Sequence, residues 1–460
     1  MVFSSVLFLF RFMPVAFILY YLTPRKLKNL ALVILSLVFY SWGEVRYFPI
    51  MIFSVVLDYT ASRGIERNAG NPRRRKLYLL LSMAGNLGML MFFKYTNFIV
   101  ANVNALTGLG LGGVNFPLPL GISFYTFQTM SYTIDVYRGD AKAERNIINF
   151  ASFVVLFPQL IAGPIVRYLD ISRELRERRH TLGQVQEGIA VFITGLGKKV
   201  LIANSCGALW REVEALGFAT LSTPMAWLGL LGFSLQIYFD FSGYSLMAIG
   251  LGKMLGFEFP QNFNYPYIAR SITDFWRRWH MTLGTWFRDY VYIPMGGNRV
   301  TPGRQVWNLF VVWGLTGLWH GASWNFVLWG LYFFVLLVVE KFLIAKTLKA
   351  HRILSHIYLI FTVMFSWSLF AITDFSQLTL FWSKLFGAAG GQDWAYYLRN
   401  YGIVLALGVI LSTPVLKRLD EAVRGRAGNW PRTVFLLVVL LLSVAYLVDA
   451  SYNPFLYFRF

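Results

Sequence analysis

Two histidines, each directly preceded by a tryptophan, are the side chains in this sequence best suited to acid–base chemistry. His280 lies in the stretch DFWRRWHMTLGTWFRDYVYIPMGGNR, and His320 lies in the stretch GLTGLWHGASWNF. The chain of 460 residues contains only five histidines, and these two share the Trp-His pattern. An imidazole accepts and returns a proton near neutral pH, and an apolar environment favours its neutral, basic form. We therefore predict that His320 and His280 serve proton chemistry.

Each histidine also has a simpler structural interpretation. His320 could be a buried imidazole that only hydrogen-bonds a neighbouring helix. Polar side chains at membrane depth are usually functional, however, and Gly317 and Gly321 leave room for a backbone or a ligand to approach. His280, within RRWH, could instead be a solvated ring at the membrane interface, and for this residue both interpretations stay open.

Four arginines close to His280 in the sequence could bind either lipid headgroups or the phosphates of a soluble donor. A guanidinium suits both, because it presents a forked set of N–H donors to phosphate oxygens. Asp274 and Asp289 flank this arginine cluster and are expected to pair with it. The cluster consists of Arg277, Arg278, Arg288 and Arg299. The predicted substrate- and donor-binding residues are Arg277, Arg278, Trp279, Arg288, Asn325 and Asp240.

Asp240 lies within the apolar run YFDFSGYS, where an ionised carboxylate is costly and needs a partner. We expect that partner to be an arginine or the ring N–H of a histidine. The residue is then either a structural strut or a group that orients the histidine, and the sequence does not distinguish the two.

The composition indicates a membrane protein with many spans. Hydrophobic residues make up 57% of the chain and charged residues 14%, whereas soluble domains carry about 25% charged residues. The formal net charge of +20 is better explained by basic cytoplasmic loops and anionic lipid than by nucleic acid, which we do not expect as a partner. Cys206 is the only cysteine, so cysteine-based zinc and redox sites are excluded, and we predict no metal.

Alternating basic and neutral loops predict the topology. The basic turn at residues 25–28 and the loop at residues 63–76 are expected to be cytoplasmic, and the N- and C-termini periplasmic. Residues 1–22 are expected to form the first span rather than a cleaved signal peptide. Residues 147–166 have arginines on both flanks and prolines within, which predicts a re-entrant element. We expect a single all-α membrane domain over residues 1–460, with about eleven transmembrane or re-entrant helices around a central tunnel.

Several motifs together resemble the membrane-bound O-acyltransferase family. They are PLGISFYTFQ (residues 119–128), FPQLIAGPI (157–165), YFDFSGYSLMAIG (238–250), FPQNFNYPY (259–267), the two histidine stretches and the closing YNPFLYFRF (452–460). They cover nearly the whole chain in the order of the family. The segments IPMGGNR and FLYFRF resemble the bacterial alginate O-acetylation branch more than the teichoic-acid D-alanylation branch. Leu246 departs from the pattern, since an acidic residue is expected after GYS.

The resemblance implies that His320 is the catalytic histidine and His280 its companion in the acyl transfer. It also implies that acetyl-CoA or an acyl carrier supplies an acetyl group from the cytoplasm, with no bound cofactor. The acetyl group would then cross the bacterial inner membrane for O-acetylation of an exopolysaccharide such as alginate, with periplasmic acetyltransferases as partners. The alternatives are peptidoglycan, cellulose or teichoic acid as acceptor, a transporter or flippase, and a scaffold without enzymatic activity.

Overall fold

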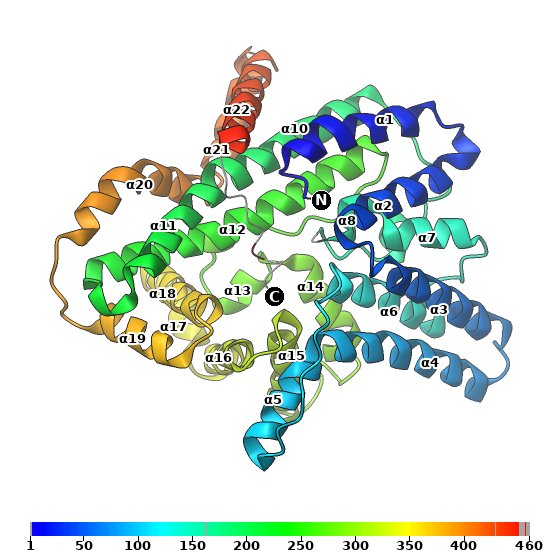
Figure 1. Cartoon of the computed structure of the whole chain (residues 1–460), viewed down its shortest axis with the longest axis horizontal. Helices are drawn as coiled ribbons and strands as arrows, with labels where there is room; N and C mark the ends of the chain where they lie inside the picture. The colour runs from blue at the N-terminus through cyan, green and yellow to red at the C-terminus, as the bar shows by residue number, and fades with distance from the viewer. Residues whose placement is uncertain (1, 162, 428, 450–455, 457–460) are drawn as a thin grey trace. The chain divides into compact units, whose positions relative to one another are not determined.

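The computed structural model describes residues 2–161, 163–427, 429–449 and 456, and the regular elements in these ranges are all helices (Figure 1). The all-α prediction is therefore confirmed. The closing motif YNPFLYFRF lies outside the described residues except for Leu456, and so does the predicted side of the C-terminus.

The chain divides into two compact units. The N-terminal unit consists of Met1–Phe192 with Met247–Pro260, and the C-terminal unit consists of Ile193–Leu246 with Gln261–Phe460. Helices α10 (Leu182–Gly197) and α12 (Thr223–Met254) each begin in the range of one unit and end in that of the other. The single domain expected from the sequence stays a prediction.

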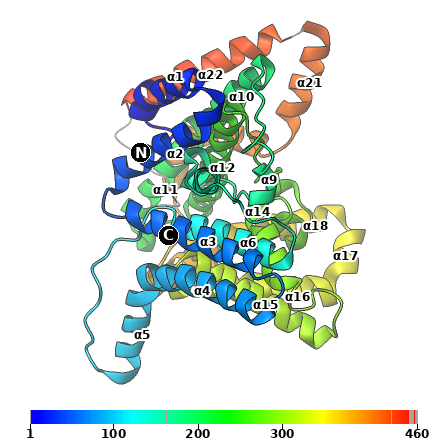
Figure 2. The same ribbon diagram turned by 90° about the vertical axis from the view of Figure 1, so that its right-hand side faces the viewer.

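The N-terminal unit is built from helices that follow one another closely in the chain. In both views α3, α4 and α6 lie side by side, and a buried carboxylate joins them (Figures 1 and 2). Asp58 on α3 accepts hydrogen bonds from Asn86 on α4 at 2.8 Å and from Thr133 on α6 at 3.0 Å. The helices are α1 (Met13–Leu22), α2 (Lys28–Glu44), α3 (Phe48–Arg67), α4 (Pro72–Leu90), α5 (Thr96–Thr107), α6 (Ile122–Arg138), α7 (Ile147–Val155), α8 (Phe157–Leu160) and α9 (Tyr168–Ile171).

The segment expected to be re-entrant is broken where its prolines predict. Helix α7 ends at Val155, Leu156 leaves the helical conformation, and α8 extends only from Phe157 to Leu160. Proline at the start of α8 provides no backbone N–H to continue the preceding helix. The break is confirmed, whereas its passage into a membrane stays a prediction.

The C-terminal unit carries both Trp-His pairs. A large apolar core fills it, with α15 and α16 packed backbone to backbone, because a side chain on Gly317 would come within 2.5 Å of the Phe326 carbonyl oxygen. Its elements are π-helix η4 (Lys198–Ala203), α11 (Asn204–Leu216), α13 (Ile272–Trp276), α14 (Met281–Phe287), π-helix η7 (Arg288–Tyr292), α15 (Pro302–His320), α16 (Trp324–Val339), π-helix η8 (Glu340–Ile344), α17 (Ala345–Ala350), α18 (Arg352–Ala371), α19 (Phe375–Phe386), α20 (Asp393–Leu411), α21 (Val415–Ala427) and α22 (Trp430–Asp449).

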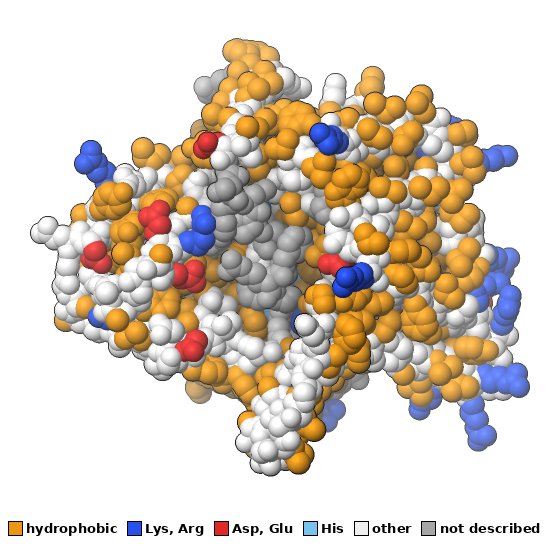
Figure 3. Space-filling model, in the orientation of Figure 1, with side chains coloured by type: hydrophobic (Ala, Val, Ile, Leu, Met, Phe, Trp, Pro, Cys, Tyr) orange, Lys and Arg blue, Asp and Glu red, His pale blue; other side chains and the backbone are white. Residues whose placement is uncertain are grey.

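Six helical segments in the described ranges are long and apolar enough to cross a membrane. Large apolar side chains are exposed on many helices, and orange apolar atoms cover much of the visible surface (Figure 3). Such a surface suits lipid rather than water. The predicted number of about eleven crossing or re-entrant helices is not confirmed. The six segments are Pro72–Thr107, Leu182–Leu216, Trp324–Ala350, Arg352–Ala371, Asp393–Leu411 and Trp430–Asp449.

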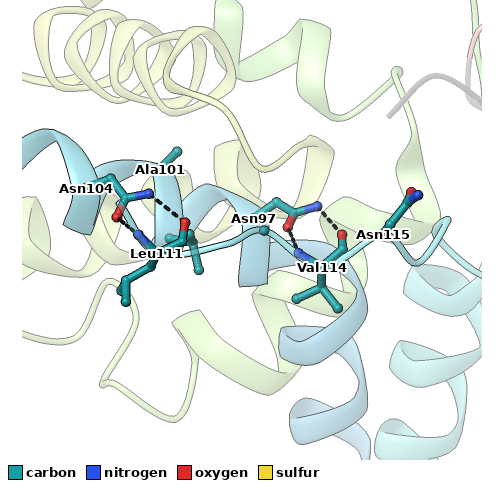
Figure 4. A pocket seen from close by; sticks show the side chains of 8 residues that line it. Asn97, Ala101, Asn104, Leu111, Val114 and Asn115 are labelled. Atoms are coloured by element: carbon teal, nitrogen blue, oxygen red, sulfur yellow. Dashed lines mark hydrogen bonds between the residues drawn. The ribbon is translucent and has the colours of Figure 1, made fainter. Parts of the chain in front are cut away.

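The loop after α5 folds back along that helix and lines an open pocket of about 370 Å³ (Figure 4). Asn104 hydrogen-bonds both backbone groups of Leu111, and Asn97 does the same for Val114, at distances of 2.7–2.9 Å. None of the predicted site residues lines this pocket.

Candidate active site

His320 is the last residue of α15 and is buried among aromatic rings. Its exposed fraction is 4%, and its ring centroid lies 4.8 Å from Trp329, 5.0 Å from Trp319 and 5.5 Å from Phe370. The C-terminal end of a helix carries a partial negative charge, which stabilises a positive charge placed there by about 0.3–1 kcal/mol. The end of α15 therefore favours a positive charge at the position of His320.

His280 is also buried, with an exposed fraction of 1%, so the interpretation of a solvated ring is wrong. It lies between α13 and α14 with φ of +44°, a conformation that non-glycine residues seldom adopt and that is often found at functional sites. The ring of Phe241 meets it edge-on at 4.7 Å. Burial lowers the pKa of His280 to about 3, so the ring is neutral at physiological pH.

Asn262 determines which nitrogen of His280 carries the proton. Its side-chain oxygen accepts a hydrogen bond from the backbone N–H of Thr282 at 3.3 Å, which fixes the orientation of the amide because that N–H can only donate. The same oxygen lies 3.1 Å from Nδ1 of His280. Nδ1 must therefore donate, and the lone pair of the neutral ring is on Nε2, where it can accept a hydrogen bond.

Trp319 brings the two histidines to one indole. The ring centroid of Trp319 lies 5.8 Å from that of His280 and 5.0 Å from that of His320. The structure thus assembles both Trp-His pairs into a single buried site, although 39 residues separate the two histidines in the chain.

Two of the four arginines near His280 pair with the flanking carboxylates. Arg278 pairs with Asp274 at 2.9 Å and Arg288 pairs with Asp289 at 2.7 Å, which confirms the predicted pairing. Arg277 is exposed.

The other predicted binding residues on this part of the chain are buried. Trp279 is 2% exposed and packs against Trp367 at 4.9 Å. The side-chain nitrogen of Asn325 donates to the carbonyl oxygen of Leu369 at 3.2 Å. Both residues shape the core around the histidines, and their contact with substrate stays a prediction.

Asp240 has a different partner from the one expected. Its carboxylate pairs with Nζ of Lys199 at 2.5 Å and accepts a hydrogen bond from the backbone N–H of Leu456 at 2.8 Å. The expectation of an arginine or a histidine partner is therefore wrong. The sequence misled because Lys199 lies on a different helical segment, η4, and only the packing of η4 against α12 brings the two charges together.

Two residues that position His280 were missed in the sequence. Asn262, in the loop before α13, orients His280, and Glu340 in η8 accepts hydrogen bonds from the backbone of Ile272 and, at 3.1 Å, of Thr273. Glu340 thereby holds the start of α13, the helix that leads to His280. A signal for Asn262 was present, since FPQNFNYPY is one of the family motifs, but nothing in it indicated a contact with His280.

Comparison with known proteins shows the protein family of this chain. Residues 141–382 match the family described as MBOAT, membrane-bound O-acyltransferase family, and this range includes both histidines. The chain belongs to this family, and it is a multi-pass membrane O-acyltransferase.

Three relatives show the range of acceptors within the family. The chain is 39% identical to the "Probable alginate O-acetylase AlgI" of Azotobacter vinelandii, with all of both chains covered. It is 31% identical to the "Peptidoglycan O-acetyltransferase" of Helicobacter pylori, with 100% of this chain and 98% of that one covered. It is 30% identical to the "Teichoic acid D-alanyltransferase" of Bacillus subtilis, with 48% of this chain and 59% of that one covered.

Proposed function

We propose that this acyltransferase takes an acetyl group from acetyl-CoA on the cytoplasmic side of the bacterial inner membrane and delivers it for O-acetylation of an exopolysaccharide. The observation that supports this most is the convergence of His320 and His280 on the indole of Trp319 in a buried site. Acyl transfer to a hydroxyl needs a base in a place from which water is excluded, since water would otherwise take the acyl group.

In the proposed reaction His320 is the general base. It takes the proton of the acceptor hydroxyl as the oxygen attacks the thioester carbonyl. The new C–O ester bond forms, the C–S bond breaks, and the proton passes from His320 to the departing thiolate. His280, neutral and with its lone pair on Nε2, helps to position the reacting groups. Arg277 and Arg299, both exposed, are the members of the arginine cluster proposed for the donor phosphates, since Arg278 and Arg288 pair with carboxylates.

Alginate is the proposed acceptor, because the relatives covered over their whole length include a probable alginate O-acetylase at 39% identity. Periplasmic acetyltransferases are the proposed partners for the final transfer. Peptidoglycan is the alternative acceptor, supported by the 31% identical peptidoglycan O-acetyltransferase. Leu246, at the position where the family pattern has an acidic residue, is the place where a difference in acceptor handling would arise.

The test is turnover of radiolabelled acetyl-CoA by the purified protein in detergent. We expect His320→Ala to abolish acetyl exchange or hydrolysis, while the protein remains folded and membrane-inserted. His351→Ala is the matched control, because His351 is exposed and distant in sequence from both Trp-His pairs. Equal turnover in His320→Ala and wild type would refute the role of His320, and transport of acetyl-CoA without any exchange or hydrolysis would favour a transporter instead.

A further inference from the structure

The N-terminal unit contains a cluster of cations that have no carboxylate partner among the residues that the structure describes. Lys28 at the start of α2 and Arg178 in the loop before α10 both lie beside the ring of Tyr20, with Lys28 Nζ at 4.2 Å and Arg178 Cζ at 5.8 Å from its centroid. Arg25 lies three residues before Lys28 and is exposed. Within the described parts of the chain, no ion pair joins Lys28, Arg25 or Arg178 to an acidic side chain.

Aromatic rings and neutral groups hold these cations in place. Lys28 is only 8% exposed, donates to the backbone oxygen of Tyr20 at 2.9 Å and lies 5.5 Å from the ring centroid of Tyr21. The guanidinium of Arg178 lies 4.5 Å from the ring centroid of Phe257. Cation–π contacts stabilise a positive charge without neutralising it, so the net charge of the cluster remains positive.

Arg178 has an N–H donor without a hydrogen-bond partner among the described residues. One of its terminal nitrogens, Nη2, donates to the side-chain oxygen of Asn29, while the other, Nη1, is buried and has no hydrogen-bond partner among the described residues. Buried N–H donors are nearly always paired, and an unpaired one costs about 1–3 kcal/mol. A guanidinium with one terminal nitrogen hydrogen-bonded to the protein and the other unpaired is suited to bind an oxyanion.

The pKa shifts of two residues in the cluster also indicate an excess of positive charge. Burial, Arg178 and Arg25 lower the pKa of Lys28, and burial, Lys28 and Arg178 lower the pKa of His180, whose Nε2 lies 2.8 Å from the hydroxyl of Tyr20. Nearby cations depress these values only where negative charge is insufficient to offset them. Arg278 and Arg288 in the C-terminal unit differ, since each has its own carboxylate.

We propose that Lys28, Arg178 and Arg25 form a binding site for a phosphate group. The site combines a buried ammonium, a guanidinium with an unused donor and an exposed arginine that adds to the local positive potential. Two sources carry this chemistry, namely the headgroup of an anionic phospholipid and the phosphates of a soluble acyl donor. The site concerns binding alone and holds whichever reaction the protein catalyses.

The experiment measures binding of both sources to the full-length protein in phosphatidylcholine nanodiscs and in neutral detergent. Coenzyme A is titrated calorimetrically in one arm, and retention of phosphatidylglycerol is followed by native mass spectrometry in the other. We expect the double variant Lys28→Gln/Arg178→Gln to bind at least tenfold more weakly in one arm, which identifies the source. Arg73→Gln/Arg74→Gln is the control, because it removes the same charge from two exposed arginines of α4 in the same unit.

A third variant keeps the proposal testable if the double variant does not fold. Arg25→Glu reverses an exposed charge without touching the packing, and we expect it to weaken the same arm several-fold. The proposal is overturned if neither probe binds the wild-type protein. It is also overturned if both probes bind equally well to wild type and to the folded Lys28 and Arg178 or Arg25 variants. Failure of the His320→Ala test would leave these binding results unaffected.

Discussion

Removing the side chain of Asn262 should take away the hydrogen bond that keeps the proton of His280 on Nδ1, while the His280 ring stays in the core. The side-chain oxygen of Asn262 accepts from His280 Nδ1 at 3.1 Å, Thr282 N at 3.3 Å and Thr282 Oγ1 at 3.0 Å, and its nitrogen donates to Ser245 Oγ at 3.0 Å. The backbone oxygen of Asn262, which accepts from Met281 N at 2.9 Å, is retained in Asn262→Ala. The loop therefore keeps one of its anchors.

The size of the effect follows from the lost hydrogen bond. A hydrogen bond between neutral groups contributes about 0.5–1.5 kcal/mol, and about 1.4 kcal/mol corresponds to a tenfold change in a population. Without the acceptor at Nδ1, the Nε2–H form of His280 becomes competitive. We expect kcat for acetyl transfer to fall about tenfold, with little change in KM because the donor contacts are not altered. Loss of the two hydrogen bonds from Thr282 to the side-chain oxygen of Asn262 should also lower the free energy of unfolding by about 1–3 kcal/mol.

The assay combines turnover with nitrogen-15 NMR of labelled histidines, which separates the two tautomers, and five histidines make the assignment tractable. Asn262→Asp should restore the Nδ1–H form, since a carboxylate keeps the acceptor. Asn86→Ala is the control, because Asn86 is equally buried but bonds to Asp58 in the N-terminal unit. The reasoning is refuted if wild-type His280 carries its proton on Nε2, or if Asn262→Ala changes the tautomer but leaves kcat as it was.

Three further outcomes follow from the structure. Lys199→Met should cost about 3–5 kcal/mol in the free energy of unfolding, because it removes the cation that compensates the buried Asp240 carboxylate. Lys199→Met/Asp240→Asn should recover most of this cost in a denaturation experiment, and a double variant no more stable than the single one would contradict the reasoning. The pKa of His280 is depressed on folding, so its contribution to stability is present above pH about 6.5 and is lost as the pH falls toward about 3. The loss is up to about 1.4 kcal/mol per pH unit. Thermal melts of His280→Gln should therefore show a smaller decrease in Tm with falling pH than wild type. Glu340→Ala should lower both kcat and stability, because the start of α13 loses the hydrogen bonds that Glu340 accepts from it. Glu340→Gln should have a smaller effect, since its side chain keeps an acceptor. An unchanged kcat in Glu340→Ala would exclude this role.

The helical class and most helix positions follow from the sequence, because the apolar runs are long and the prolines and basic turns mark their ends. The apolar run at residues 353–372 forms α18 (Arg352–Ala371), and the one at residues 434–448 lies within α22 (Trp430–Asp449). Helix α20 (Asp393–Leu411) begins ten residues before its apolar run at residue 403, and its first turns, DWAYYLRNYG, carry no hydropathy signal. Polar turns that extend a helix beyond its apolar stretch are set by capping and packing rather than by hydrophobicity.

Within the site, the sequence identified the two histidines by their residue type and their Trp-His pattern, and it predicted the pairing of Asp274 and Asp289 with neighbouring arginines. These features are local, since each involves residues of one or two helical turns. The partner of Asp240, the tautomer of His280 and the uncompensated cations around Tyr20 are different. Each depends on groups far apart in the chain, Lys199 with Asp240, Asn262 with His280 and Lys28 with Arg178, which only the packing of the helices brings together.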